Sequence, residues 1–65
     1  MTPDFMATIE QRAVAARATM TDVCARADVS YSTWYRARHK GKTLKIKTVG
    51  RIEDAIAAIE RERTA

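Results

Sequence analysis

A stripe of apolar residues near the C-terminus constrains the fold more than any other feature of this sequence. Its members are three, three, four and three positions apart: Ile46, Val49, Ile52, Ile56 and Ile59. An α-helix returns to the same face about every 3.6 residues, so this spacing predicts a helix with one buried face. We expect this helix over residues 45–63. Gly50 within it either marks a close approach of another helix or is an exposed residue that weakens the helix.

The start of the chain predicts another helix. Thr2 is a favourable N-cap residue, and Pro3 suits the first helical position, where a backbone N–H has no helical partner. Phe5 and Ile9 follow on one helical face, four positions apart. We expect this helix over residues 3–17.

Two shorter helices joined by a tight turn are predicted in between. Thr19 and Asp22 have the spacing of a capping box, which satisfies two backbone N–H groups at the start of a helix. Asp28 tolerates the left-handed backbone that ends a helix, and Ser30 can cap the next one. The pair is expected over residues 20–27 and 30–39.

The chain is therefore expected to be all-α, with a compact four-helix domain that takes up residues 1–65. No strand pattern or internal repeat is present. Cys24 is the only cysteine, which excludes an intramolecular disulfide and suits a reducing cytoplasm. The N-terminus does not resemble a secretory signal, and no apolar run approaches the roughly 20 residues of a membrane span. We expect no membrane contact.

The positive charge of the chain is concentrated in one block. The net charge is +4, yet residues 36–51 contain seven basic residues and no acidic one. Charge that only keeps a protein in solution would be spread more evenly along the chain. The block predicts a surface that binds a polyanion.

No enzymatic or metal-binding site is predicted. Cys24 and His39 are two potential metal ligands 15 positions apart, and the sequence has no other cysteine or histidine to complete a zinc site. Cys24 lies on the apolar side of a short helix, without the neighbouring base that a nucleophile needs. We expect no catalysis, no cofactor and no small-molecule ligand.

The two short helices contain a motif known from DNA-binding proteins. The stretch TMTDVCARADVSYSTWYRAR resembles the helix-turn-helix of phage repressor and Cro-type (lambda repressor-like) transcription regulators. The resemblance implies that Val29 is buried after the turn and that Trp34 and Ala37 face inward. Trp34 stands where the family has a smaller aliphatic residue, so either neighbouring small residues make room for it or the second helix tilts. The candidate small residues are Ala13, Ala16, Cys24 and Ala55.

The resemblance also implies which side chains contact DNA. In this family the second helix of the pair, the recognition helix, lies in the major groove and its outward side chains read base edges. The expected base-reading residues are Tyr31, Ser32, Tyr35 and Arg36. Arg36 is the strongest of them, since a guanidinium can donate two hydrogen bonds to guanine. Either tyrosine has the alternative of covering the rim of the core. Contacts to the DNA backbone are expected from Thr19, Thr21, Arg38, His39, Lys40, Lys42, Lys45 and Lys47.

These features predict a sequence-specific, double-stranded DNA-binding transcription regulator. By resemblance it is a small phage or prophage-type repressor or autoregulator, which binds an inverted-repeat operator as a homodimer and blocks a promoter. It would act in the cytoplasm of a bacterial host, at the nucleoid when bound. The dimer contact is expected from Ile52, Ile56 and Ile59, unless these close the core of a single chain. The alternatives are a DNA-recognition adaptor of a phage packaging or recombination complex, and a protein-interaction or RNA-binding module.

Overall fold

The computed structural model describes the backbone of residues 3–64 and the side chains of residues 5–63. Over this range the chain forms four helices and no strand, which confirms the predicted all-α class. The helices are α1 (Pro3–Ala15), α2 (Met20–Ala27), α3 (Tyr31–His39) and α4 (Ile46–Thr64). The predicted cap at Thr2 lies outside the described residues.

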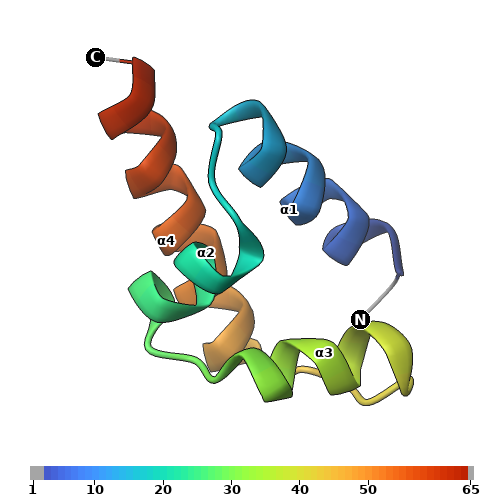
Figure 1. Cartoon of the computed structure of the whole chain (residues 1–65). Coiled ribbons are helices and arrows are strands. Elements are labelled where there is room, and N and C mark those ends of the chain that lie inside the picture. Colours follow the sequence, from blue (N-terminus) through green and yellow to red (C-terminus); the bar gives the residue numbers. More distant parts are fainter. Residues whose placement is uncertain (1–2, 65) are drawn as a thin grey trace.

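The helices enclose one small core. Figure 1 shows α1 and α4 on either side of α2, with α3 running across the lower end of the molecule. Helix α2 packs mainly against α4 and also contacts α3 and α1. This arrangement leaves one long side of α3 uncovered, at the same end of the molecule as the loop that leads to α4 (Figure 1).

Helix α1 ends two residues before the predicted boundary. Arg17 adopts a left-handed backbone, with φ of 59°. The N–H of Arg17 donates to the carbonyl of Val14 at 2.9 Å, and the N–H of Ala18 donates to that of Ala13 at 2.8 Å. This pair of bonds is a Schellman motif, which usually places glycine at the left-handed position. An arginine at this position gives no sequence signal for a helix end, which is why the helix was predicted to extend to residue 17.

The turn between α2 and α3 forms as the sequence predicts. The Thr19 hydroxyl accepts the N–H of Asp22 at 3.1 Å, and the Asp22 carboxylate accepts the N–H of Thr19 at 3.0 Å. Asp28 is left-handed, with φ of 58° and ψ of 41°. The Ser30 hydroxyl then accepts the N–H of Thr33 at 3.2 Å and starts α3. Side-chain caps thus start both helices, and the left-handed Asp28 ends α2 at the turn.

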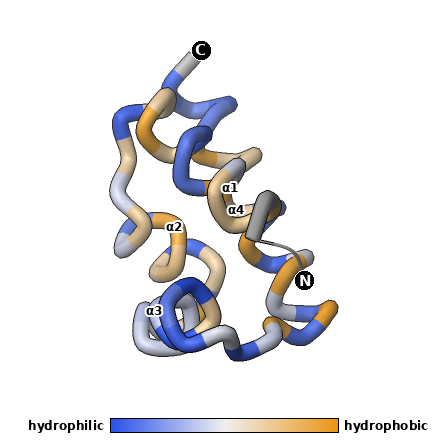
Figure 2. Tube along the Cα trace, turned by 90° about the vertical axis from the view of Figure 1, so that its right-hand side faces the viewer, coloured by the Kyte–Doolittle hydropathy of each residue, from blue (hydrophilic) through white to orange (hydrophobic). Residues whose placement is uncertain are grey.

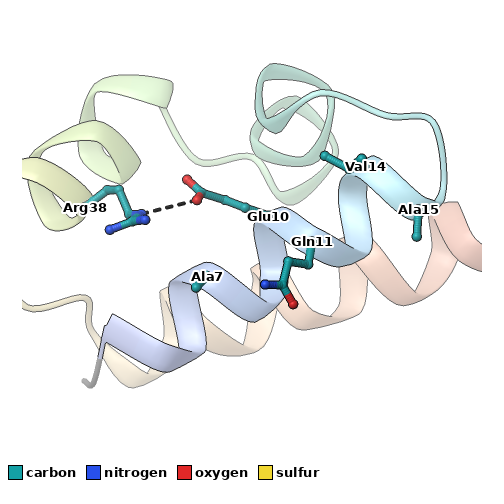
Figure 3. A pocket seen from close by; sticks show the side chains of 6 residues that line it. All are labelled: Ala7, Glu10, Gln11, Val14, Ala15 and Arg38. Carbon is teal, nitrogen blue, oxygen red and sulfur yellow. Dashed lines mark hydrogen bonds and ion pairs between the residues drawn. The ribbon is translucent and has the colours of Figure 1, made fainter.

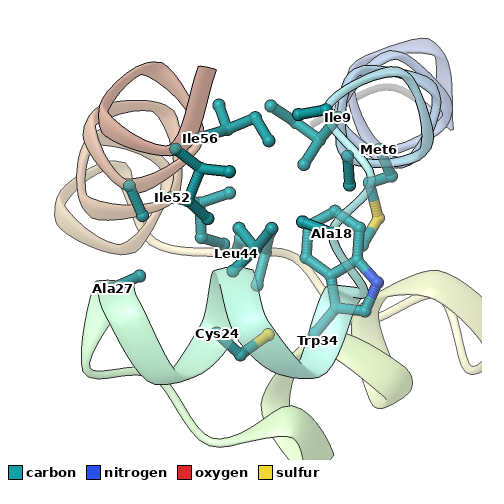
Figure 4. Close-up of a cluster of buried hydrophobic side chains, with 14 of the residues drawn as sticks. Met6, Ile9, Ala18, Cys24, Ala27, Trp34, Leu44, Ile52 and Ile56 are labelled. Carbon is teal, nitrogen blue, oxygen red and sulfur yellow. The ribbon is translucent and has the colours of Figure 1, made fainter. Parts of the chain in front are cut away.

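Trp34 is the largest side chain of the core and is only 1% exposed. Figure 4 shows its indole ring entering the apolar cluster from α3, opposite side chains of α1 and α4. The small residues named as candidates to make room for it are all buried: Ala13, Ala16, Cys24 and Ala55. Val29 is half-buried against the same cluster, and Ala37 is buried. The ring is therefore accommodated by small neighbours.

The apolar stripe of α4 closes this core. Ile52, Ile56 and Ile59 are 0%, 0% and 3% exposed within a single chain. Within one chain these side chains therefore take the alternative role, closure of the core, and leave little surface for a second copy to contact.

Ile46 also departs from its predicted place in the stripe, being 90% exposed. The steps from Ile46 to Val49 and from Val49 to Ile52 are three residues each, and each step falls short of a full helical turn by about 60°. Together they carry Ile46 away from the face that holds Ile52. Leu44, just before the helix, is buried in its place. Leu44 lies between the helices predicted over residues 30–39 and 45–63, and no sequence pattern indicated that it belongs to the core.

Gly50 lies on the exposed side of α4, and a Cβ built on it would meet no atom within 4 Å. The alternative of a close helix approach is therefore excluded. We expect Gly50→Ala to raise the free energy of unfolding by about 1 kcal/mol, because alanine loses less backbone freedom than glycine in a helix. Urea unfolding followed by helical circular dichroism measures this. The matched control, Gly41→Ala, is expected to lower stability because Gly41 has φ of +73°.

Two ion pairs fasten α4 to its neighbours. The Arg12 guanidinium donates to both carboxylate oxygens of Glu60, at 2.9 and 2.5 Å, and Arg26 pairs with Glu62 in the same way. The hydrogen bonds from the arginines lower the pKa of Glu60 and of Glu62 below the ordinary 4.5. A carboxylate whose pKa is lowered in the folded state contributes its full stabilisation above its ordinary pKa. This contribution is lost as the pH falls through the lowered pKa.

Stability should therefore be level above pH 4.5 and decline at lower pH. Urea unfolding at a series of pH values measures this. The double substitution Glu60→Gln with Glu62→Gln should flatten the decline, whereas the exposed control Asp54→Asn should leave its slope between pH 4.5 and 3 unchanged. An equally steep decline in the double variant would show that other carboxylates cause it.

Candidate nucleic-acid interface

The uncovered side of α3 carries an ordered row of aromatic rings. Because Trp34 and Ala37 turn inward, Tyr31, Tyr35 and His39 lie on the outer side, one helical turn apart. The ring centroids of Tyr31 and Tyr35 are 6.4 Å apart, and those of Tyr35 and His39 are 4.5 Å apart. Both tyrosines are 46% exposed. The rings pack along the helix surface, and about half of each tyrosine stays available to a partner.

Beside this row, Ser32 and Arg36 are also exposed. Thus the predicted base-reading residues do share the outer side of α3, and the structure brings all of them together. Figure 2 shows this helix in the blue and pale colours of hydrophilic and neutral residues, whereas orange apolar segments concentrate in the other helices and at the start of α4.

The loop after α3 and the first turn of α4 carry the lysines of the basic block. Lys40, Lys42, Lys45 and Lys47 are all exposed. Lys40 is the C-cap residue of α3, and its N–H donates to the carbonyl of Arg36 at 2.8 Å. Buried Leu44 anchors the other end of the loop in the core. The loop is therefore fastened at both ends, which holds its lysines near α3.

Arg38 does not belong to this group of free cations. Its guanidinium pairs with the carboxylate of Glu10 on α1, with Nε and Oε1 3.2 Å apart (Figure 3). The pair borders a hollow of about 460 Å³ lined by Ala7, Glu10, Gln11, Val14, Ala15 and Arg38. The structure thus turns Arg38 toward α1, and its predicted role at the DNA backbone is not supported. Glu10 is 28 positions away in sequence, so no local pattern announced the pair.

The start of α2 is also less suited to phosphate than the sequence suggested. The Thr19 hydroxyl already accepts a hydrogen bond in the capping box, and Thr21 is exposed beside it. The hydrogen bonds from Thr19 lower the pKa of Asp22, which keeps a negative charge at this helix end. That carboxylate accepts the backbone N–H of Thr19 and repels a second anion.

The charges of the basic block are largely uncompensated. Ion pairs among the described side chains join Arg12 to Glu60, Arg26 to Glu62 and Arg38 to Glu10. None of these pairs uses the other six cations of the block: Arg36, Lys40, Lys42, Lys45, Lys47 and Arg51. Six unpaired positive charges on α3, the following loop and the first two turns of α4 create a potential that attracts a polyanion.

The described part of the chain offers little else with chemical reactivity. Its His, Cys, Asp and Glu residues form no group of three or more that could hold a metal ion. Cys24 is buried, and burial raises the pKa of its thiol, which keeps it in the unreactive protonated form. None of the described helices is both long and apolar enough to cross a membrane.

Comparisons with protein-family models, curated proteins and solved structures find no match for this chain. The geometry and charge of α3 and the following loop are therefore what bear on its function.

Proposed function

We propose that this protein binds double-stranded DNA in a sequence-specific manner, with α2 and α3 acting as a helix-turn-helix. The observation that supports this most is the uncovered side of α3, where aromatic and hydroxyl side chains are flanked by uncompensated cations. An α-helix with side chains is about 10–12 Å across and fits the major groove of B-form DNA, which is about 12 Å wide.

In this proposal the two kinds of side chain have separate tasks. Tyr31, Ser32 and Tyr35 contact base edges, because hydroxyl groups can donate or accept hydrogen bonds and the rings can pack on a thymine methyl group. Lys40, Lys42, Lys45 and Lys47 contact phosphates, which position the protein without reading sequence. His39, at the end of the aromatic row, contacts the backbone where α3 leaves the groove.

The protein acts as a homodimer. Helix α3 has nine residues and spans about 13 Å, enough for only a few base pairs. Two copies on half-sites about 34 Å apart supply the missing contacts and require an inverted repeat. The resemblance to small phage repressors favours a repressor or autoregulator that occupies an operator at the nucleoid of a bacterial cell. Its dimer contact involves surfaces other than the buried isoleucines of α4.

Selection of bound duplexes from a random library, with the purified chain at near-physiological salt, tests this proposal. Enrichment of an inverted repeat is the expected result, and the variant Tyr31→Ala with Tyr35→Ala should lose that enrichment while retaining weak, salt-dependent binding. Binding without any enriched sequence would contradict a repressor and favour an adaptor. Absence of duplex binding would exclude the proposed function altogether.

A further inference from the structure

We propose that a hollow between α3 and the following loop is a binding site for one phosphate group, and that Arg36 is a ligand of this phosphate and not a base reader. The inference deepens the proposed DNA-binding function and rests on it for the identity of the phosphate, a group of the DNA backbone. The hollow has a volume of about 200 Å³ and is lined by Thr33, Arg36, Ala37, Lys42, Thr43 and Leu44.

The loop is fixed so that two cations border the same hollow. The N–H groups of Lys40 and Lys42 both donate to the carbonyl of Arg36, at 2.8 and 3.4 Å. Gly41 between them has φ of +73°, a left-handed conformation that turns the chain back toward α3. Lys42 is thereby held beside Arg36 by backbone hydrogen bonds, independently of the flexibility of its own side chain.

The electrostatics of the hollow favour an anion. No carboxylate lines it, and neither Arg36 nor Lys42 takes part in an ion pair with any described side chain. Two neighbouring like charges raise the free energy of the empty site, and an anion between them reverses the sign of that interaction. The hollow is thus most stable when it contains negative charge.

The donors around the hollow match a tetrahedral oxyanion. A guanidinium has five N–H donors and an ammonium has three, and the Thr43 hydroxyl can add one more. The Thr33 hydroxyl is already within hydrogen-bond distance of Ser30, at 2.9 Å, so it contributes less. A water molecule takes up about 30 Å³ of liquid, so the hollow has room for a phosphate group with some of its waters.

The helical position of Arg36 separates it from the aromatic row. The residues of α3 that line the hollow lie on its side next to the loop: Thr33, and Arg36 and Ala37 three and four positions after it. Tyr31, Tyr35 and His39 form a different row of the helix surface. The residues that read bases and the residue that binds phosphate therefore lie on two adjacent stripes of α3.

Substitutions of Arg36 in the full chain test its role against a panel of single-base variants of the selected operator. Arg36→Lys should keep the preference at every base position and weaken all duplexes by the same few-fold factor, since charge is retained. Arg36→Ala should also keep the preference, weaken all duplexes equally and reduce the salt slope by about 0.9. A loss of preference at one base position in either variant would overturn the assignment and make Arg36 a base reader.

A probe without bases tests the site separately from DNA recognition. Inorganic phosphate, titrated into the isotope-labelled chain, should shift the backbone amide resonances of Thr33, Arg36, Lys42 and Thr43, and Lys42→Gln should abolish these shifts. Arg61→Gln, at the far end of α4, is the matched control and should leave them unchanged. Equal shifts around every lysine, or no shifts, would overturn the site. Phosphate shifts in a chain that binds no duplex would keep the site but refute the proposed function.

Discussion

Replacing Trp34 with alanine is expected to lower the free energy of unfolding by about 4 kcal/mol, the largest loss of stability from any single substitution in this chain. The indole is the largest fully buried side chain, and loss of a buried aromatic ring typically costs 3–5 kcal/mol, about 4 on average. A domain of 65 residues is expected to have a total stability of roughly 3–10 kcal/mol. One substitution thus removes between about two fifths and all of the free energy of folding, because the neighbouring alanines cannot expand to fill the cavity. Helical circular dichroism during urea unfolding measures the effect.

The matched control for Trp34→Ala is Tyr35→Ala, which removes an aromatic ring from the outer side of the same helix. Tyr35 is 46% exposed, so this variant should keep nearly the full stability of the parent chain. Equal destabilisation by the two substitutions would contradict the inward placement of Trp34. Trp34→Phe should fall between them, because it keeps a buried ring of smaller volume.

The largest expected effect on DNA binding comes from neutralising the lysines at the start of α4. We expect Lys45→Gln with Lys47→Gln to remove two phosphate contacts and to make the slope of log affinity against log salt shallower by about 1.8. At about 0.1 M salt the affinity should fall roughly 60-fold, because each contact releases bound counterions. Fluorescence anisotropy of a labelled operator at several salt concentrations measures both quantities.

The same helix offers a control with the same change in net charge. Arg61→Gln with Arg63→Gln also removes two positive charges, about 24 Å farther along α4 at a rise of about 1.5 Å per residue. This control should leave the salt slope unchanged and weaken binding only slightly. If both double variants lose affinity equally, the net charge of the chain and not the surface beside α3 governs binding.

The helix boundaries that short polar side chains control could be predicted from the sequence. Thr19 with Asp22 starts α2 and Ser30 starts α3, each through side-chain hydrogen bonds to residues three positions away. Asp28 ends α2 with a left-handed backbone, and its N–H donates to the carbonyls of Ala25 and Cys24. The end of α1 could not be predicted, because arginine at position 17 is an unusual residue for the left-handed conformation it adopts.

Some features of the candidate site could likewise be predicted from the sequence, and others could not. The exposure of Tyr31, Ser32, Tyr35 and Arg36 follows from the helical period once Trp34 is placed inside. The engagement of Arg38 by Glu10 and the hollow beside Arg36 depend on how distant segments pack, which local spacing does not encode. Leu44 was missed for the same reason, since a single apolar residue among lysines has no periodicity.

The buried Cys24 thiol can report how often the core of this molecule opens. It is the only thiol of the chain and lies in the core on α2, the helix that packs mainly against α4. A thiol reagent therefore reaches it only when the core around α2 opens, and the rate of labelling reports how often that happens. Helix α2 is joined to α3 by the turn at Asp28. Comparison of the labelling rate with and without a bound duplex therefore measures how much a ligand on the outer side of α3 suppresses opening of the core.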